Sequence, residues 1–244
     1  MKPFLILQLR PETEASNNEF EAILEKGGLA PERAHRICLD HETLPESLSL
    51  DRFAGVIVGG GPGCVSDPPE KKSPLDARME DAVMSLMPEI AESDIPFMGC
   101  CYGIGILGKH LGGDVSKARY SEEVGVSTCR LTPDGTTDPM LAGAPQVFDA
   151  FVGHKEAVQT LPPGCTHLVS SGPCPFQMIR YKRNVYATQF HPEADASVFH
   201  VRISIYKDYG YFPPEEAGRL RAMVDAADVH APEHILRNFV QTYG

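Results

Sequence analysis

The sequence predicts a single α/β domain in which helices flank one central, mostly parallel sheet. Three observations predict this fold. Short apolar runs, typical of buried strands, alternate with segments of helical spacing in the first half of the 244 residues. The second half reads mainly as further strands, which predicts a smaller antiparallel β element there. No repeat, low-complexity segment or long linker divides the chain, so residues 1–244 are expected to form one unit.

The first half has the alternation that a parallel sheet requires. The runs "FLILQL" and "GVIVGG" are apolar enough for strands covered on both faces, and "NEFEAILEKGG" predicts a helix that Gly27 and Gly28 close. A strand–helix–strand order of this kind gives parallel strands. In chain order, the predicted elements are strand 3–9, helix 18–28, strands 35–40 and 53–60, helix 76–93, strand 95–100 and helix 102–113.

The second half adds strands and closes with helices. Residues 195–244 are expected to form a C-terminal helical extension of the same domain. This extension contains an aromatic-rich stretch, "VRISIYKDYGYF", which predicts either a cap over the sheet or a face for a partner or a second copy. The predicted strands cover 123–131, 147–152, 167–171, 176–181 and 185–190, and the predicted helices cover 214–227 and 232–243.

Composition argues against several classes of function. The 33 acidic and 22 basic residues give a formal net charge of -11, and no Lys/Arg cluster offers a phosphate-binding surface, so nucleic acid is not an expected partner. The N-terminal apolar run is too short for a signal peptide, and no stretch has the roughly 18 apolar residues of a membrane helix. We therefore expect a cytoplasmic protein without membrane contact.

The cysteines and histidines give no sign of a disulfide framework or a metal site. Seven cysteines is an odd number, and they form no C-x-x-C pair, so free and mostly buried thiols are expected. The nine histidines lack the spacing of metal ligands. Neither a metal nor a cofactor is predicted.

The stretch "FMGCCYGIGILGKHLGG", residues 97–113, places two cysteines where an apolar strand passes into a helix. Gly99 and Gly103 lie two positions to either side of Cys101, the spacing of a nucleophile elbow, in which glycines let the strand and the helix approach around a strained turn. Cys100 would then pack in the core. The N-terminus of the following helix favours the thiolate of Cys101, which makes Cys101 the predicted nucleophile. A tight turn with two buried cysteines is the alternative interpretation of this stretch alone.

A base and its orienting acid follow in "YATQFHPEAD". His191 comes after an apolar strand and Glu193 lies two residues on, so in extended chain both side chains point to the same side. Pro192 between them prevents helix continuation. By itself, this stretch is also compatible with an ordinary strand end. Joined to the elbow cysteine, the pair completes a nucleophile, a base and an orienting carboxylate.

The glycine-rich run "VIVGGGPG", which begins at Val56, is a third element. Its glycines leave backbone N–H groups free to point into a site, which suits an oxyanion hole. The run is not a P-loop, because no Gly-Lys-Ser/Thr follows. Alone, it would predict no more than a β–α turn.

In this order, the three elements resemble the class I glutamine amidotransferases. "GCCYGIGILGKHLGG" is similar to the nucleophile segment of that family, "GGGPG" to its oxyanion loop and "TQFHPE" to its His-x-Glu segment. The resemblance implies a flavodoxin-like fold and a catalytic triad of Cys101, His191 and Glu193. The oxyanion donors that it implies are the backbone N–H groups of Gly61 and Tyr102.

The resemblance also implies the substrate side of the site. "GHKEAVQTLPPG" is similar to the His-x-Asp segment of the family, with His154 in place and Glu156 in the position of the Asp. Gly60 and Gly105 are the other implied substrate-binding positions. The family usually carries a Gln at the position of Gly105, where it helps to hold the substrate glutamine. Here the glycine predicts a bulkier γ-glutamyl substrate, a missing contact, or a neighbouring side chain that replaces it.

The implied reaction is the hydrolysis of a γ-glutamyl amide, either glutamine or another γ-glutamyl compound, through a thioester on Cys101. Because 244 residues leave no room for a synthase domain, we expect either a separate ammonia-accepting synthase subunit or a free-standing hydrolase, alone or as a homodimer. Two alternatives remain open. One is a γ-glutamyl peptidase that does not use free glutamine, and the other is a non-catalytic regulatory or binding relative.

Overall fold

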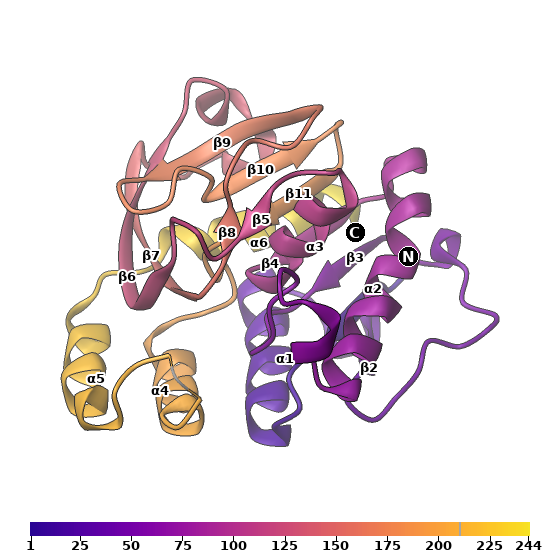
Figure 1. Cartoon of the computed structure of the whole chain (residues 1–244). Helices are drawn as coiled ribbons and strands as arrows, with labels where there is room; N and C mark the ends of the chain where they lie inside the picture. The colour runs from indigo at the N-terminus through magenta and orange to yellow at the C-terminus, as the bar shows by residue number, and fades with distance from the viewer. Residues whose placement is uncertain (210) are drawn as a thin grey trace.

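A nine-stranded sheet runs through the molecule in the order β2-β1-β3-β4-β11-β10-β9-β6-β7 (Figure 1). The computed structural model describes residues 1–209 and 211–244. The prediction of a mostly parallel central sheet is confirmed, because parallel pairing joins the larger part of it. The parallel strands are β2 (Ala34–Cys38), β1 (Phe4–Gln8), β3 (Gly55–Val58), β4 (Phe97–Cys100) and β11 (Val185–Thr188).

The antiparallel strands continue the same sheet. Figure 1 shows them in the upper and left parts of the view. The predicted antiparallel element of the second half is therefore present, mostly as an extension of the main sheet. Its strands are β10 (Met178–Tyr181), β9 (Cys165–Ser171), β6 (Glu122–Leu131) and β7 (Val147–His154), and the short strands β5 (Val115–Ser116) and β8 (Ala157–Val158) pair separately.

Helices cover both faces of the parallel strands, which explains why these strands read as continuous apolar runs. Phe4 and Ile6 of β1 lie in one core cluster with residues of α1 and α6, whereas Leu5 and Leu7 lie in a second cluster with residues of α2 and α3. The helices are α1 (Thr13–Gly27), α2 (Pro74–Ser93), α3 (Tyr102–His110), α4 (Ala196–Tyr206), α5 (Ala217–Ala226) and α6 (Ala231–Tyr243).

The helix α4 was not predicted as a separate element. Its stretch "VRISIY" alternates apolar and polar residues as a strand does, which hides the helical period. The stretch is helical because side chains three and four residues apart, among them Phe199 and Ile203, pack in a third core cluster that also holds Phe151 of β7. Helix α1 also begins earlier than predicted, at Thr13, because Ala15 already packs in the interior.

The structure also describes the cysteines and the character of the helices. All seven cysteines are free, and all but Cys165 are buried, as predicted. Within the described ranges, none of the helices has the length and apolar character that crossing a membrane would need.

The arrangement of the sheet brings three loops together. Strands β3, β4 and β11 are parallel neighbours, so the loops that follow their carboxyl ends lie at the same edge. These loops carry the glycine-rich run, Cys101 and His191.

Candidate active site

Cys101 occupies a sharp turn between β4 and α3. Its φ is +53°, in the left-handed region that side chains with a Cβ rarely adopt, and its N–H donates to the carbonyl oxygen of Thr188 at 2.8 Å. A Cβ at Gly99 would lie 2.9 Å from the backbone of Gly103, so glycine is needed where the strand and the helix meet. Cys100 is fully buried in the core, as expected. The backbone therefore forms the predicted strained elbow.

The electrostatic prediction for Cys101 was wrong. Burial raises the pKa of the Cys101 thiol to about 12, although the charge of Arg10 acts in the opposite direction. The desolvation of a thiolate at this buried position outweighs the favourable N-terminus of α3. Cys101 is therefore a neutral thiol at neutral pH, and a base must take its proton before or during attack.

His191 and Glu193 form the predicted pair. The Nδ1 atom of His191 lies 2.9 Å from Oε1 of Glu193, and both side chains are buried. They meet in a turn, where the N–H of Ala194 donates to the carbonyl oxygen of His191, and not in extended chain. Burial, followed by the charge of Arg202, lowers the pKa of His191 to about 4. The imidazole is thus neutral at pH 7 and able to accept a proton.

Arg202 of α4 completes the surroundings of Glu193. Its Nη2 donates to Oε1 of Glu193 at 2.7 Å, so this oxygen accepts from both Arg202 and His191. Burial opposes the ionisation of Glu193. The charges of His191 and Arg202, and their hydrogen bonds to this carboxylate, outweigh burial and hold its pKa well below the usual range. The orienting acid therefore stays ionised.

The glycine-rich loop after β3 packs directly on charged side chains. A Cβ at Gly59 would collide with Oε2 of Glu19, and one at Gly60 would lie 2.5 Å from Nη2 of Arg10. The N–H of Gly60 donates to Oε1 of Glu19 at 3.1 Å. Besides freeing the backbone, these glycines make room for a buried ion pair, which the sequence interpretation missed.

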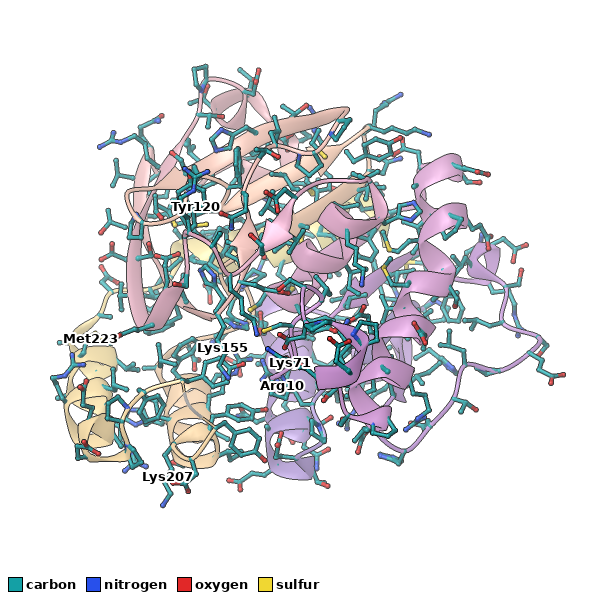
Figure 2. The ribbon with its side chains drawn as sticks, in the orientation of Figure 1. Arg10, Lys71, Tyr120, Lys155, Lys207 and Met223 are labelled. Atoms are coloured by element: carbon teal, nitrogen blue, oxygen red, sulfur yellow. The ribbon has the colours of Figure 1, made fainter. Side chains whose placement is uncertain are left out.

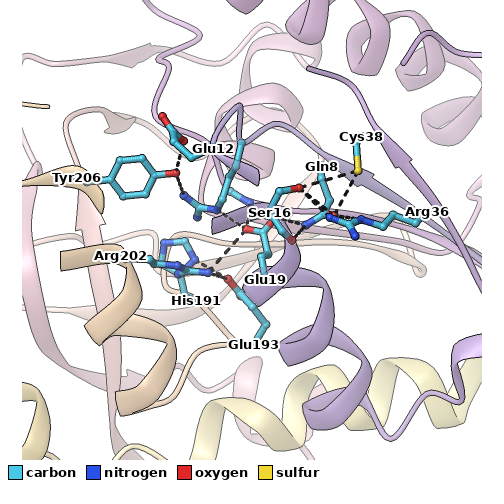
Figure 3. Close-up of polar contacts among 12 residues, drawn as sticks. Gln8, Glu12, Ser16, Glu19, Arg36, Cys38, His191, Glu193, Arg202 and Tyr206 are labelled. Carbon is cyan, nitrogen blue, oxygen red and sulfur yellow. Dashed lines mark hydrogen bonds and ion pairs between the residues drawn. The ribbon is translucent and has the colours of Figure 1, made fainter. Parts of the chain in front are cut away.

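Figure 3 shows that this ion pair belongs to a wider network. Glu19 accepts from Arg10 Nε at 2.8 Å and from Gln8 Nε2 at 3.0 Å, and Arg202 Nη2 lies 3.7 Å from the same carboxylate. Tyr206 links Arg10 to Glu12 through its hydroxyl group. Glu19 of α1 and Arg202 of α4 thus belong to one network, which contacts the glycine-rich loop through the N–H of Gly60.

The sequence does contain a signal for these residues. Glu19 lies in the buried stripe of α1 with Ala15 and Ala22, and Arg202 lies in the buried stripe of α4 with Val198. A charged residue at a core position of an apolar stripe is costly unless it is paired. Such positions could have been flagged, but their partners, Arg10 and Glu193, lie nine positions away and outside the same helix.

The predicted oxyanion donors lie beside the nucleophile. Gly61, Cys101 and Tyr102 line one small cavity together. Among the hydrogen bonds of the described residues, neither the Gly61 N–H nor the Tyr102 N–H has a partner, so both remain available to an oxygen of a ligand.

Two small cavities meet at Cys101, and both include Gly61, Gly153 and Tyr211. We call them the Arg10 cavity and the Glu156 cavity. Figure 2 labels Arg10 and Lys155, which line these two sides of Cys101. The Arg10 cavity has a volume of about 30 Å3, and its other lining residues are Arg10, His191, Phe199, Arg202 and Tyr206. The Glu156 cavity has a volume of about 20 Å3, and its other lining residues are Gly63, Cys64, Tyr102, His154, Lys155, Glu156 and Gln189.

His154 lines the Glu156 cavity, but the protein uses both of its ring nitrogens. Nδ1 lies 2.9 Å from the backbone oxygen of Glu156, and Nε2 lies 2.9 Å from Oε2 of Glu122. The Glu156 carboxylate itself accepts from the N–H groups of Val65 and Ser66, each at 2.8 Å. His154 therefore fixes the backbone that presents the Glu156 carboxylate.

The structure leaves no open space at Gly105. A Cβ there would lie 3.0 Å from Cγ2 of Val65 and 3.1 Å from Oε1 of Glu156. The neighbours of Gly105 thus give no support to the expectation of room for a bulkier substrate at this position. Because the Glu156 carboxylate lies next to it, the arrangement favours the interpretation in which a neighbouring side chain replaces the Gln contact, over the one in which the contact is missing.

One group of buried side chains in this region has the composition of a metal site. Ligand atoms of Glu122, His154 and Cys174 lie within 4.8 Å of one another. However, His154 and Glu122 are in direct hydrogen-bond contact, and Glu122 also accepts from Gln177 at 2.6 Å. The hydrogen bonds account for these polar groups without a metal.

Comparison with known proteins identifies the family. The model of the family described as glutamine amidotransferase class-I matches residues 32–204. A glutamine-hydrolysing GMP synthase of Lactococcus lactis is 35% identical over 162 residues, which are 66% of this chain and 28% of that protein. The chain thus spans under a third of the length of this relative.

Solved structures share the fold over the whole chain. A glutamine amidotransferase from Thermotoga maritima has a TM-score of 0.76 at 22% identity and covers 100% of this chain and 98% of its own. A glutamine amidotransferase from Methylobacillus flagellatus has a TM-score of 0.73 at 20% identity, with 100% and 96% covered. Taken with the family match over residues 32–204, these findings show that the chain belongs to the class I glutamine amidotransferase family.

Proposed function

We propose that this protein hydrolyses the γ-amide bond of a γ-glutamyl substrate through a thioester on Cys101. The observation that carries the proposal is the gathering of three kinds of group around Cys101, in the two cavities that share this residue. These are a thiol on a strained elbow, a neutral and buried imidazole, and two N–H groups without partners. Each corresponds to one requirement of acyl transfer, namely a nucleophile, a base and an oxyanion hole.

In the proposed mechanism, His191 takes the proton of the Cys101 thiol as Sγ bonds to the γ-carbonyl carbon. The N–H groups of Gly61 and Tyr102 donate to the oxyanion. When the tetrahedral intermediate collapses, the C–N bond breaks and His191 returns the proton to the departing nitrogen. Glu193 keeps Nδ1 protonated and stabilises the imidazolium. Water, deprotonated by His191, then attacks the thioester and releases glutamate and the Cys101 thiol.

A second candidate is the supply of ammonia to a separate synthase. It is favoured by the similarity to a GMP synthase, of which this chain matches only 28%. In that case free glutamine is the donor, and an ammonia-accepting subunit is the partner. The non-catalytic alternative has less support, because Cys101 shares one cavity with His191, which is hydrogen-bonded to Glu193, and the other cavity with Gly61 and Tyr102.

We also infer that residues 1–244 act as one catalytic unit and that the extension 195–244 belongs to the site. Arg202 and Tyr206 of α4 line the cavity at Cys101, and α6 packs in the same core cluster as β1. Action in the cytoplasm, without nucleic acid or membrane partners, and a homodimeric state stay predictions from the sequence.

The test is to trap the thioester or a stable analogue of it. A glutamine-analogue electrophile should label Cys101, and mass mapping should find the label there and not on Cys100. Glutamate release from a panel of γ-glutamyl amides should be lost in Cys101→Ser and kept in the matched variant Cys100→Ala. Labelling of Cys100 instead, or a panel on which no compound is cleaved or acylates the protein, would contradict the proposed function.

A further inference from the structure

The two cavities at Cys101 should receive different parts of a substrate. This step rests on the proposed function. The departing nitrogen of the amide takes its proton from His191, so it must lie on the His191 side of Cys101, which is the Arg10 cavity. The γ-glutamyl part then takes the other cavity, the Glu156 cavity.

Arg10 presents an unused donor on the leaving-group side. The side chain is 5% exposed, its Nε donates to Glu19 and its Nη1 donates to the hydroxyl of Tyr206. Its Nη2 makes no hydrogen bond within residues 1–209 and 211–244. A Cβ at Gly60 would lie 2.5 Å from this Nη2 and 2.9 Å from Cε1 of His191, so Arg10 and the imidazole flank the same small space.

Arg202 adds a second guanidinium to this side. It is 7% exposed, its Nη2 is taken by Glu193, and its buried Nη1 has no partner among the described residues. Each guanidinium is paired with a carboxylate, but Arg10 Nη2 and Arg202 Nη1 have no acceptor among the described residues. An amine that carries its own carboxylate offers Arg10 Nη2 a charged acceptor, which a departing ammonia does not.

We propose that the preferred substrates are γ-glutamyl amides whose amine part carries a carboxylate, such as γ-glutamyl amino acids and peptides, with Arg10 Nη2 as the donor to that carboxylate. The Arg10 cavity, at about 30 Å3, has room for only a few atoms. Tyr211 lines both cavities and is held by a hydrogen bond of 3.2 Å from its hydroxyl to the Pro62 carbonyl. A complete γ-glutamyl amino acid is larger than either cavity, so its binding requires the linings to open, and Tyr211 belongs to both of them.

The experiment compares two donors that differ only in charge, γ-L-glutamylglycine and γ-L-glutamylglycinamide. Glutamate release should give a kcat/KM about 10- to 100-fold higher for γ-glutamylglycine, which is the range expected for a hydrogen bond to a charged group. In Arg10→Gln this ratio should fall toward one. The matched variant Arg36→Gln alters an arginine that contacts Gln8, Asn17 and Ser16 but lines neither cavity, so it should keep the ratio of the native protein.

The ratio compares the kcat/KM of two substrates in the same protein, so a general loss of activity in a variant does not affect it. If Arg10→Gln does not fold, the comparison of the two donors in the native protein still decides. Cleavage of both donors at similar rates would overturn this inference and leave the proposed function standing. If neither donor nor glutamine is cleaved and Cys101 is not acylated, both proposals fail.

Discussion

The two cavities that meet at Cys101 are built from different kinds of contact. In the Glu156 cavity, the Glu156 carboxylate is held by two backbone N–H groups, and His154 is held by a backbone oxygen and by the Glu122 side chain. In the Arg10 cavity, the two arginines are held by ion pairs, Arg10 with Glu19 and Arg202 with Glu193. The resemblance predicts Gly61, Cys101 and His191 of the Arg10 cavity, but not Arg10 and Arg202, which lie outside the segments that carry it.

Of all changes in the two cavities, removal of the base His191 should have the largest effect on activity. In His191→Ala, kcat should fall by about 10²- to 10⁴-fold, because the neutral Cys101 thiol loses its proton acceptor. Glu193→Gln should cost less, since the imidazole remains and loses only its fixed tautomer and the stabilisation of its charged form. Steady-state kinetics with a γ-glutamyl substrate measures both. Near-native turnover in His191→Ala would exclude the proposed triad.

The elements that could be predicted are those whose signals are local. The apolar runs of β1, β3 and β4 and the glycines around Cys101 each indicate their structure within a few residues. The contact between His191 and Glu193 spans only two positions, so it too was accessible to the sequence. This locality explains why the parallel sheet, the elbow and the pair were predicted correctly.

Several contacts that were missed span long separations. Arg10 contacts Tyr206 across 196 positions, and Val65 contacts Glu156 across 91. In each pair, the sequence around one residue does not indicate which residue it will contact. The prediction of a Cys101 thiolate failed for a related reason. The helix N-terminus that favours the thiolate can be seen in the local sequence, whereas the burial that raises the pKa of the thiol depends on the whole fold.

The second prediction compares one buried carboxylate on each side. Glu19→Gln should lower the free energy of unfolding by about 3–5 kcal/mol, because Arg10 loses its counter-charge in the interior. Glu156→Gln should cost about 1–3 kcal/mol, because an amide can still accept from one of the two N–H groups that Glu156 now binds. Urea unfolding gives both values. Equal losses would show that the two sides do not differ in how they are stabilised.

The third prediction tests the packing of the Glu156 side at Gly105. Gly105→Gln should destabilise the protein by about 1–3 kcal/mol, because the added side chain meets Val65 and Glu156 at close range. It should also weaken substrate binding rather than restore it.

Gly218 on α5 provides the matched control for this change. A Cβ there meets nothing within 4 Å, so Gly218→Gln should be neutral or stabilise the helix by up to about 1 kcal/mol. Thermal unfolding and KM for glutamine decide the comparison. A lower KM in Gly105→Gln would mean that Val65 and Glu156 give way and that the family contact can be rebuilt.

The pH dependence of kcat/KM should show the smallest effect at neutral pH. It is also the sharpest test of the difference between the two cavities. The pKa of His191 is lowered from 6.5 to about 4, first by burial and then by the charge of Arg202, while Glu193 acts in the opposite direction. His191 must be neutral to accept the Cys101 proton, so kcat/KM should be constant from about pH 5 to pH 7 and fall as the pH drops through about 4. The native protein should also lose stability between pH 6.5 and about 4, because the unfolded chain binds a proton at His191 that the folded chain excludes.

The two sides should then separate in the variants. Arg202→Gln removes a positive charge beside the imidazole, so the pKa of His191 should rise and the acid limb of kcat/KM should move to higher pH. Glu156→Gln, on the opposite side of Cys101, should leave the limb where it is. The measurement is a pH profile of kcat/KM for one γ-glutamyl substrate in the three proteins, with folding followed by circular dichroism at each pH. If the limb stays near pH 4 in Arg202→Gln, burial alone sets the base and Arg202 serves only to hold Glu193. If it moves in both variants, the charges of the two cavities act on His191 together, and the division of the site into two electrostatically separate sides is wrong.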